Sequence, residues 1–356
     1  MKILISDYHV GCQLWQASLL ENMGHEVFVC SFSGHSVYLS PEIKRINLTL
    51  PLSADDKARI AKEFDTVLVS FPPSFITVFK DISFRLPKIL NCGHRLQIHT
   101  NNCTGFTAYL KEMIDKKEII IGSMSKYDSE YIRHYLGVTP FELYVTCCHI
   151  PKGIYLPTRK EILIAPVHAH NITPFEGIDH MNSCAQNMGF DLEFSFVKSI
   201  YGNYTYDDIR NHKACVLFPY SAFSISMIEL YELNIPMFVP CKELLLKLNL
   251  MNDVKLSPCY MTECDMKKYD EPHVNSPHKF SPNSYDNDAT SYWIDFSYFY
   301  TKKNVILWDG ISDLFEKLSK TNLEMVSHLM DEENNAHREL QKNNWASLLN
   351  GIKTRL

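Results

Sequence analysis

Short apolar runs alternate along the chain with segments whose apolar residues recur at helical spacing. The run 2–7 predicts a buried strand. The segment 12–24 repeats apolar residues such as Leu14 and Leu19 before it stops at Gly24, a residue that often ends helices. Strands that alternate with helices in this way are typical of βα units built around a parallel sheet.

This alternation fills the first part of the chain up to a break at 147–160. The break contains Pro151, Gly153 and Pro157 and shows no periodicity, so we interpret it as a linker. Before it, the pattern also predicts strands at 25–32, 66–71, 88–93 and 118–124 and helices at 53–64, 73–82, 104–116 and 126–136.

A second βα series follows the linker. It predicts strands at 161–166, 192–198 and 214–218 and helices at 177–188, 206–212, 241–248, 311–320 and 322–350. Residues 252–290 are polar and rich in Pro, Asn, Ser and Asp, so we expect an insertion with little regular structure. The fold class predicted is α/β, with two doubly wound Rossmann-like domains facing a cleft. We expect an N-terminal domain over 1–150, a C-terminal domain over 151–334, and a helix over 335–356 that returns to the N-terminal domain.

Composition narrows the class of protein. The chain has 356 residues, which is long for a single core. Its net charge of −6 gives no support to nucleic acid or an anionic membrane as a partner. Eleven scattered cysteines without a C-x-x-C motif argue against a zinc ribbon or a disulfide framework. We expect a cytoplasmic protein with reduced thiols, because the apolar N-terminal run is short for a signal peptide and no stretch is long enough for a membrane span.

The segment 218–240 reads as a strand, a turn, an amphipathic helix and another strand. Its turn has small or hydroxyl side chains around Phe223, so a ligand could approach the backbone. Helix N-termini favour phosphate, and Glu229, further along the helix, could accept hydrogen bonds from a ribose diol. The segment therefore suggests a nucleotide-diphosphate site. A structural role stays open, because the dipole stabilises an acid near a helix start without any ligand.

Residues 218–240 resemble the donor-binding segment of GT-B glycosyltransferases, in which a strand ending in Pro leads to an E-G-F-G loop and a helix with a second Glu. Phe223 matches the loop aromatic, Ser224 the second glycine and Glu229 the ribose-binding Glu. Residues 174–179 are similar to the family's P-x-K-G-hydrophobic-D motif, 122–137 to the end of its N-terminal domain, and 88–95 to the strand that carries a His. The block 281–309 resembles one in glycosyltransferases of large algal viruses and algae, which suggests a viral origin.

The resemblance implies transfer of a sugar from a nucleotide-diphosphate sugar to a glycan, a glycoprotein or another hydroxyl acceptor. It implies no metal and no cofactor besides this co-substrate. The sequence departs from the family at two positions. The donor loop has Ser221 where the family has its first Glu, and the motif at 174–179 has Glu176 where the family has Lys. Lys198 and Arg210 are therefore our candidates for neutralising the diphosphate. The donor-binding residues expected are Ser221, Ala222, Phe223, Ser224, Ile225, Glu229, Lys198, Arg210 and His168.

Three residues of the N-terminal half are candidates for catalysis: Asp7, His9 and His94. In inverting transfer a base removes the proton of the acceptor hydroxyl, and neutral His suits this near pH 7. In retaining transfer the leaving diphosphate assists, so no protein base is obligatory. His94 could instead be a structural residue bonded to the backbone. Glu232 lies one turn beyond Glu229, and we interpret it as a structural or surface acid.

Other motifs give weaker signals. His168, His170 and His180 have no carboxylate that completes a metal site. Asp286–Asp288 mimics the D-x-D of metal-dependent transferases, but it lies in the polar segment, where a loop is the simpler interpretation. The sequence has no P-loop and no G-x-G-x-x-G after its first strand. Two alternatives stay open: a sugar-nucleotide epimerase, and a non-enzymatic nucleotide- or sugar-binding protein of the same fold.

Overall fold

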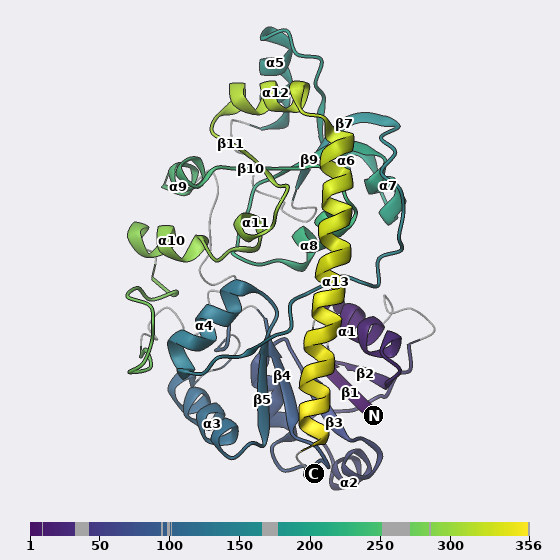
Figure 1. The fold of residues 1–356 in the computed structure, drawn as a ribbon, viewed down its shortest axis with the longest axis vertical. Helices are drawn as coiled ribbons and strands as arrows, with labels where there is room; N and C mark the ends of the chain where they lie inside the picture. The colour runs from purple at the N-terminus through teal and green to yellow at the C-terminus, as the bar shows by residue number, and fades with distance from the viewer. Residues whose placement is uncertain are drawn as a thin grey trace. The chain divides into compact units, whose positions relative to one another are not determined.

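The computed structural model describes residues 1–8, 10–32, 43–93, 95–97, 100, 102–165, 177–250, 271–284 and 286–354 (Figure 1). The chain forms two compact units. Unit 1 contains the described residues of 1–149, 261–284 and 338–356, and unit 2 contains those of 150–260 and 285–337. Each unit holds one parallel sheet with helices around it.

Unit 1 is built on a six-stranded parallel sheet in the order β2-β1-β3-β4-β5-β6. From β1 the chain adds β2 on one side and then crosses to β3 on the other, so the strand order reverses between β1 and β3. The strands are β1 (Lys2–Asp7), β2 (Glu26–Ser31), β3 (Thr66–Val69), β4 (Lys88–Cys92), β5 (Ile119–Ser123) and β6 (Phe141–Glu142). The helices are α1 (Val10–Asn22), α2 (Ala54–Glu63), the 3-10 helix η2 (Pro73–Phe79), α3 (Cys103–Asp115) and α4 (Lys126–Leu136).

Unit 2 repeats this plan with a five-stranded parallel sheet in the order β11-β10-β9-β7-β8, so its order reverses between β7 and β9. The strands are β7 (Arg159–Ala165), β8 (Phe194–Phe196), β9 (His212–Leu217), β10 (Met237–Pro240) and β11 (Ile306–Trp308). The helices are α5 (Ile178–Asn187), α6 (Val197–Ile200), α7 (Tyr206–Arg210), α8 (Ile225–Glu232), α9 (Lys242–Leu250), α10 (Asn287–Ile294), α11 (Tyr298–Thr301) and α12 (Ile311–Lys320).

Local sequence explains where many helices begin and end. Ser53 caps α2 by accepting a hydrogen bond from the Asp56 amide, and Ser125 caps α4 in the same way. Gly137 ends α4 in the left-handed conformation, which glycine adopts without strain. The central strands β3 and β4 are buried along their whole length, as expected for parallel strands covered on both faces.

The helix α13 (Leu323–Lys353) is the long yellow helix of Figure 1, and its residues belong to both units. Its residues up to His337 cluster with unit 2, where Asn334 donates to the Tyr231 carbonyl. Its later residues cluster with unit 1, where the buried Trp345 packs edge to face on Trp15 with ring centroids 6.5 Å apart. Apolar and amide side chains of one helix therefore contribute to two cores.

Three expectations are corrected by the structure. The segment 73–82 contains only the short 3-10 helix η2. The predicted strand 192–198 ends at Phe196, and Lys198 lies in the helical turn α6 instead of ending a strand. In the polar segment 252–290, the described residues 271–284 have no helix or strand, as expected, and contact α4 through His278 and Asn283; the helix α10, which begins at Asn287, was not expected.

Candidate functional site

The loop 218–224 lies at the point of unit 2 where the strand order reverses. It follows β9, and Phe218 donates from its amide to the Ala165 carbonyl at the end of β7 (3.0 Å). Ligands of open α/β sheets bind outside the carboxyl ends of the strands at such a reversal. The topology therefore places the predicted donor loop where this class of fold binds ligands.

Hydroxyl groups fix the conformation of this loop. Tyr220 donates to the Ser224 hydroxyl (3.0 Å), which also bonds to the Ser226 hydroxyl (2.8 Å), while Ser221 donates to the Phe223 carbonyl (2.7 Å). Ser224 is the N-cap residue of α8, yet its side chain makes no capping bond. The first turn of α8 thus lacks the side-chain cap that a serine normally supplies, which suits a helix end that binds an anion.

The turn is more enclosed than its small side chains suggest. Ser221, Phe223, Ser224 and Ile225 are all buried, and Ala222 is half-buried with its carbonyl accepting a hydrogen bond from the Tyr298 amide (3.1 Å). Phosphate contact by the amides of 222–225 stays a prediction.

Glu229 lies half-buried in α8, close to Tyr206 of α7 and to Tyr204, which precedes that helix. Tyr206 donates to Glu229 Oε1 at 3.4 Å, a long hydrogen bond. Burial, together with the charge of Glu229, raises the pKa of Tyr204. Sequence reasoning missed these tyrosines because no spacing rule links 204–206 to α8. Glu232, in contrast, is buried at the end of α8 with 4% of its surface exposed, so it is a structural acid and not a surface one.

The two candidate cations lie at opposite edges of the unit 2 sheet. Lys198 follows β8 at the carboxyl edge, where the donor loop also lies, and it is exposed. Arg210 precedes β9 and therefore lies at the amino edge. It is buried, donates to the Pro151 carbonyl (2.8 Å) and forms an ion pair with Asp207. This placement favours a structural role for Arg210, because its guanidinium anchors the segment that precedes β7; diphosphate binding by Arg210 stays an untested prediction.

Among the catalytic candidates only Asp7 can be placed. It ends β1 with no exposed surface, and its Oδ2 accepts a hydrogen bond from the Phe71 amide (3.1 Å). This bond ties β1 to the segment after β3, which favours a structural role for Asp7; its expected catalytic role stays a prediction. His9, His94 and His168 lie outside the described residues, as do His170 and Glu176.

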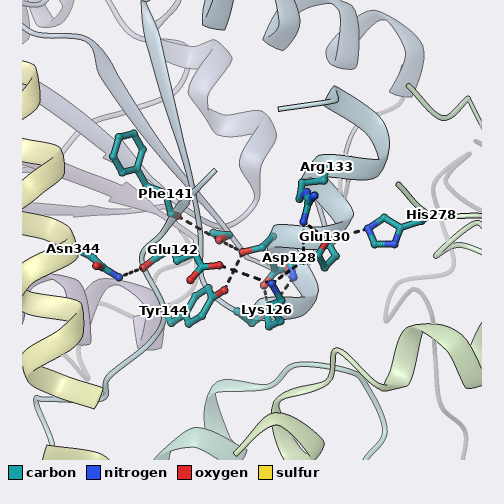
Figure 2. Close-up of polar contacts among 12 residues, drawn as sticks. Lys126, Asp128, Glu130, Arg133, Phe141, Glu142, Tyr144, His278 and Asn344 are labelled. Carbon is teal, nitrogen blue, oxygen red and sulfur yellow. Dashed lines mark hydrogen bonds and ion pairs between the residues drawn. The ribbon is translucent and has the colours of Figure 1, made fainter. Parts of the chain in front are cut away.

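A cluster of charges around the buried side chains of Glu130 and His278 has a structural role in unit 1. Figure 2 shows Glu130 of α4 between Lys126, Arg133 and His278, whose Nε2 lies 3.0 Å from Glu130 Oε2. Burial alone would raise the pKa of Glu130, but hydrogen bonds from His278 and Lys126 outweigh it and lower that pKa to about 2. The cluster docks 271–284 on α4. Sequence reasoning missed this cluster: helical spacing could have indicated the Lys126–Glu130 and Glu130–Arg133 pairs, but nothing local points to His278.

Within the described residues, no group of three or more His, Cys, Asp or Glu side chains could hold a metal ion. Asp286, the first residue of the D-x-D look-alike, caps α10 by accepting from the Asp288 amide at 2.8 Å, so the segment is a helix start and not the loop expected. None of the helices in the described ranges has the length and apolar character needed to cross a membrane.

Comparisons with known proteins show the fold. No protein-family model and no curated protein matches the chain. The structure of Arabidopsis thaliana UGT89C1 complexed with UDP-L-rhamnose is similar over 99% of this chain and 98% of that chain, with a TM-score of 0.50 and 11% identity. The glycosyltransferase SnogD from Streptomyces nogalater is similar over 98% of both chains (TM-score 0.46, 9% identity). The α/β fold class with two doubly wound parallel sheets, as in GT-B glycosyltransferases, is confirmed.

Proposed function

We propose that this protein is a glycosyltransferase that moves a hexosyl or pentosyl group from a nucleotide-diphosphate sugar to a hydroxyl acceptor. The observation that carries the proposal is the uncapped start of α8 at the strand reversal of unit 2, followed in the same helix by the half-buried Glu229. Such a site matches a diphosphate and a ribose diol in the order in which a sugar nucleotide presents them.

In this scheme the backbone amides of 222–225 and the positive end of α8 hold the diphosphate, and Glu229 accepts hydrogen bonds from the ribose. Lys198, at the same edge of the sheet, adds a positive charge. These groups stabilise the negative charge that develops on the leaving diphosphate as the anomeric bond breaks. The scheme requires no metal and no cofactor other than the sugar nucleotide.

The acceptor in this proposal is a glycan or glycoprotein hydroxyl, and His94 and His9 stay candidates for the base that an inverting reaction needs. The donor class is supported by UGT89C1, which is complexed with UDP-L-rhamnose. We also propose a cytoplasmic location, supported by the free thiols of the described cysteines. Viral origin rests on the sequence resemblance alone.

The test is calorimetry of the full chain with a panel of UDP-, GDP- and TDP-sugars, with sugar release followed in parallel. We expect one nucleotide class to bind and its sugar to be released slowly to water or rapidly to an acceptor. Interconversion of the donor sugar without release would indicate an epimerase. Tight binding without turnover would indicate a binding protein, and no binding to any of the donors would overturn the proposal.

A further inference from the structure

Three aromatic side chains gather at the strand reversal of unit 1. Tyr8 directly follows β1, Phe32 directly follows β2, and Phe75 lies in η2, which follows β3. All three come from the carboxyl ends of neighbouring strands, and β1 and β3 are the pair between which the strand order reverses. This is the position in unit 1 that corresponds to the donor loop in unit 2.

The rings support one another. Phe75 packs edge to face on Tyr8, with centroids 6.2 Å apart and planes at 80°, and on Phe32, at 5.5 Å and 86°. Both geometries are the T-shaped arrangement that aromatic pairs favour. Phe75 therefore braces both of the rings that follow the first two strands.

Backbone hydrogen bonds fix the segments that carry these rings. The Tyr8 amide donates to the Phe71 carbonyl (2.8 Å), and the Phe71 amide donates to the Asp7 carboxylate (3.1 Å). The buried Asp7 and the Tyr8 amide thus hold the segment after β1 against the segment after β3. A ring held in this way contacts a ligand without the entropy cost of first being ordered.

Tyr8 combines this support with exposure. Tyr8 is 46% exposed, whereas Phe32 and Phe75 are half-buried. Single exposed aromatic residues are common on protein surfaces. What distinguishes Tyr8 is its place at the carboxyl edge of a doubly wound sheet, where its ring packs on Phe75, which in turn packs on Phe32, and where its amide is bonded to Phe71.

We propose that Tyr8, backed by Phe75 and Phe32, is a stacking platform for a sugar ring of the acceptor, so that the acceptor is a carbohydrate. This inference rests on the proposed function, which assigns the donor nucleotide to unit 2 and leaves the edge of unit 1 for the acceptor. One face of a pyranose carries polarised C–H groups, which are attracted to the negative face of an aromatic ring.

The test measures glycan binding without donor. The full chain is applied to a glycan array, and the oligosaccharide that binds best is titrated against the parent, Tyr8→Phe and Tyr8→Leu. We expect Tyr8→Leu to weaken binding by about 3- to 10-fold and Tyr8→Phe to change it by less than about 2-fold, because stacking requires the ring and not the hydroxyl. Phe141→Leu is the matched control, because Phe141 is 41% exposed in the same unit, on β6. It should bind the oligosaccharide like the parent.

Three results would overturn the inference: a parent that binds no glycan, equal binding by the parent and Tyr8→Leu, or loss of glycan binding when free nucleosides compete at Tyr8. Thermal unfolding of each variant confirms that it is folded. Donor binding by the parent, measured separately, keeps the two proposals apart. If the parent binds glycans through Tyr8 but binds no sugar nucleotide, the proposed function is contradicted and the stacking platform is still supported.

Discussion

Glu229 is the side chain on which the proposed donor site depends. It is half-buried and has a tyrosine hydroxyl at 3.4 Å, so a ribose would meet a carboxylate that is already oriented. Glu229→Gln keeps the shape but removes the charge from its hydrogen bonds, each worth about 1.5–3 kcal/mol when sheltered. We predict that donor affinity falls by about 10- to 100-fold with the fold intact, as calorimetry and circular dichroism would show.

The control is Glu232→Gln, which removes the same charge from the same helix. Glu232 is buried at the end of α8, so this change should affect stability more than donor affinity. Weaker donor binding by Glu232→Gln together with parent-like binding by Glu229→Gln would show that the assignment along α8 is wrong.

Glu130 gives a prediction for the dependence of stability on pH. Its pKa is lowered from 4.5 to about 2 in the folded chain, so the unfolded chain binds its proton first as pH falls. The stabilisation is therefore fully present above about pH 4.5 and is lost towards pH 2, and its size is on the order of 2–3 kcal/mol. Glu130→Gln should be less stable than the parent at pH 7, and the difference should shrink as pH falls from 5 to 3.

Urea unfolding at each pH measures this difference. Glu112→Gln is the control, because Glu112 forms an exposed ion pair with Lys116 and should change stability little at any pH. A constant difference between the parent and Glu130→Gln over the whole range would contradict the role given to the buried cluster.

At the scale of elements, Lys198 of α6 and Arg210 at the end of α7 lie at opposite edges of the sheet, so we expect opposite effects on donor binding and stability when each is replaced. Arg210→Met removes the bond to the Pro151 carbonyl and the ion pair with Asp207, so we expect a loss of about 1.5–3 kcal/mol in unfolding free energy and unchanged donor affinity. Lys198→Met should leave stability unchanged and weaken donor binding by about 2- to 5-fold at low salt. Calorimetry measures donor affinity and urea unfolding measures stability for both variants. Weaker donor binding by Arg210→Met, with parent-like binding by Lys198→Met, would instead support Arg210 as a donor-binding residue.

At the scale of the whole molecule, the proposed mechanism neutralises the diphosphate with backbone amides, a helix terminus and one lysine. Donor binding and turnover should therefore persist in EDTA within about 2-fold of their values in buffer. Loss of activity in EDTA and recovery on addition of Mn²⁺ would instead require a metal to stabilise the leaving group.

The sequence by itself determined the elements and the fold class. The spacing of hydrophobic residues over a short segment distinguishes a strand from a helix, and capping residues such as Ser53 and Ser125 mark where helices begin. Both series of βα units could therefore be predicted. The loop 218–224 could be predicted as a ligand site for the same reason, because the end of a parallel strand and the start of the next helix are adjacent in sequence.

Only the tertiary structure decided where the candidate side chains lie relative to the proposed site. Arg210 and Lys198 look alike in sequence, but strand direction places them at opposite edges of one sheet. The burial of Asp7 and the pairing of Glu130 with His278, 148 residues away, depend on segments that local patterns cannot bring together. Hydrophobic periodicity and secondary-structure propensity depend on residues close together in sequence. Burial and hydrogen bonding depend on residues that are close in space, and these come together only when the sheet is assembled.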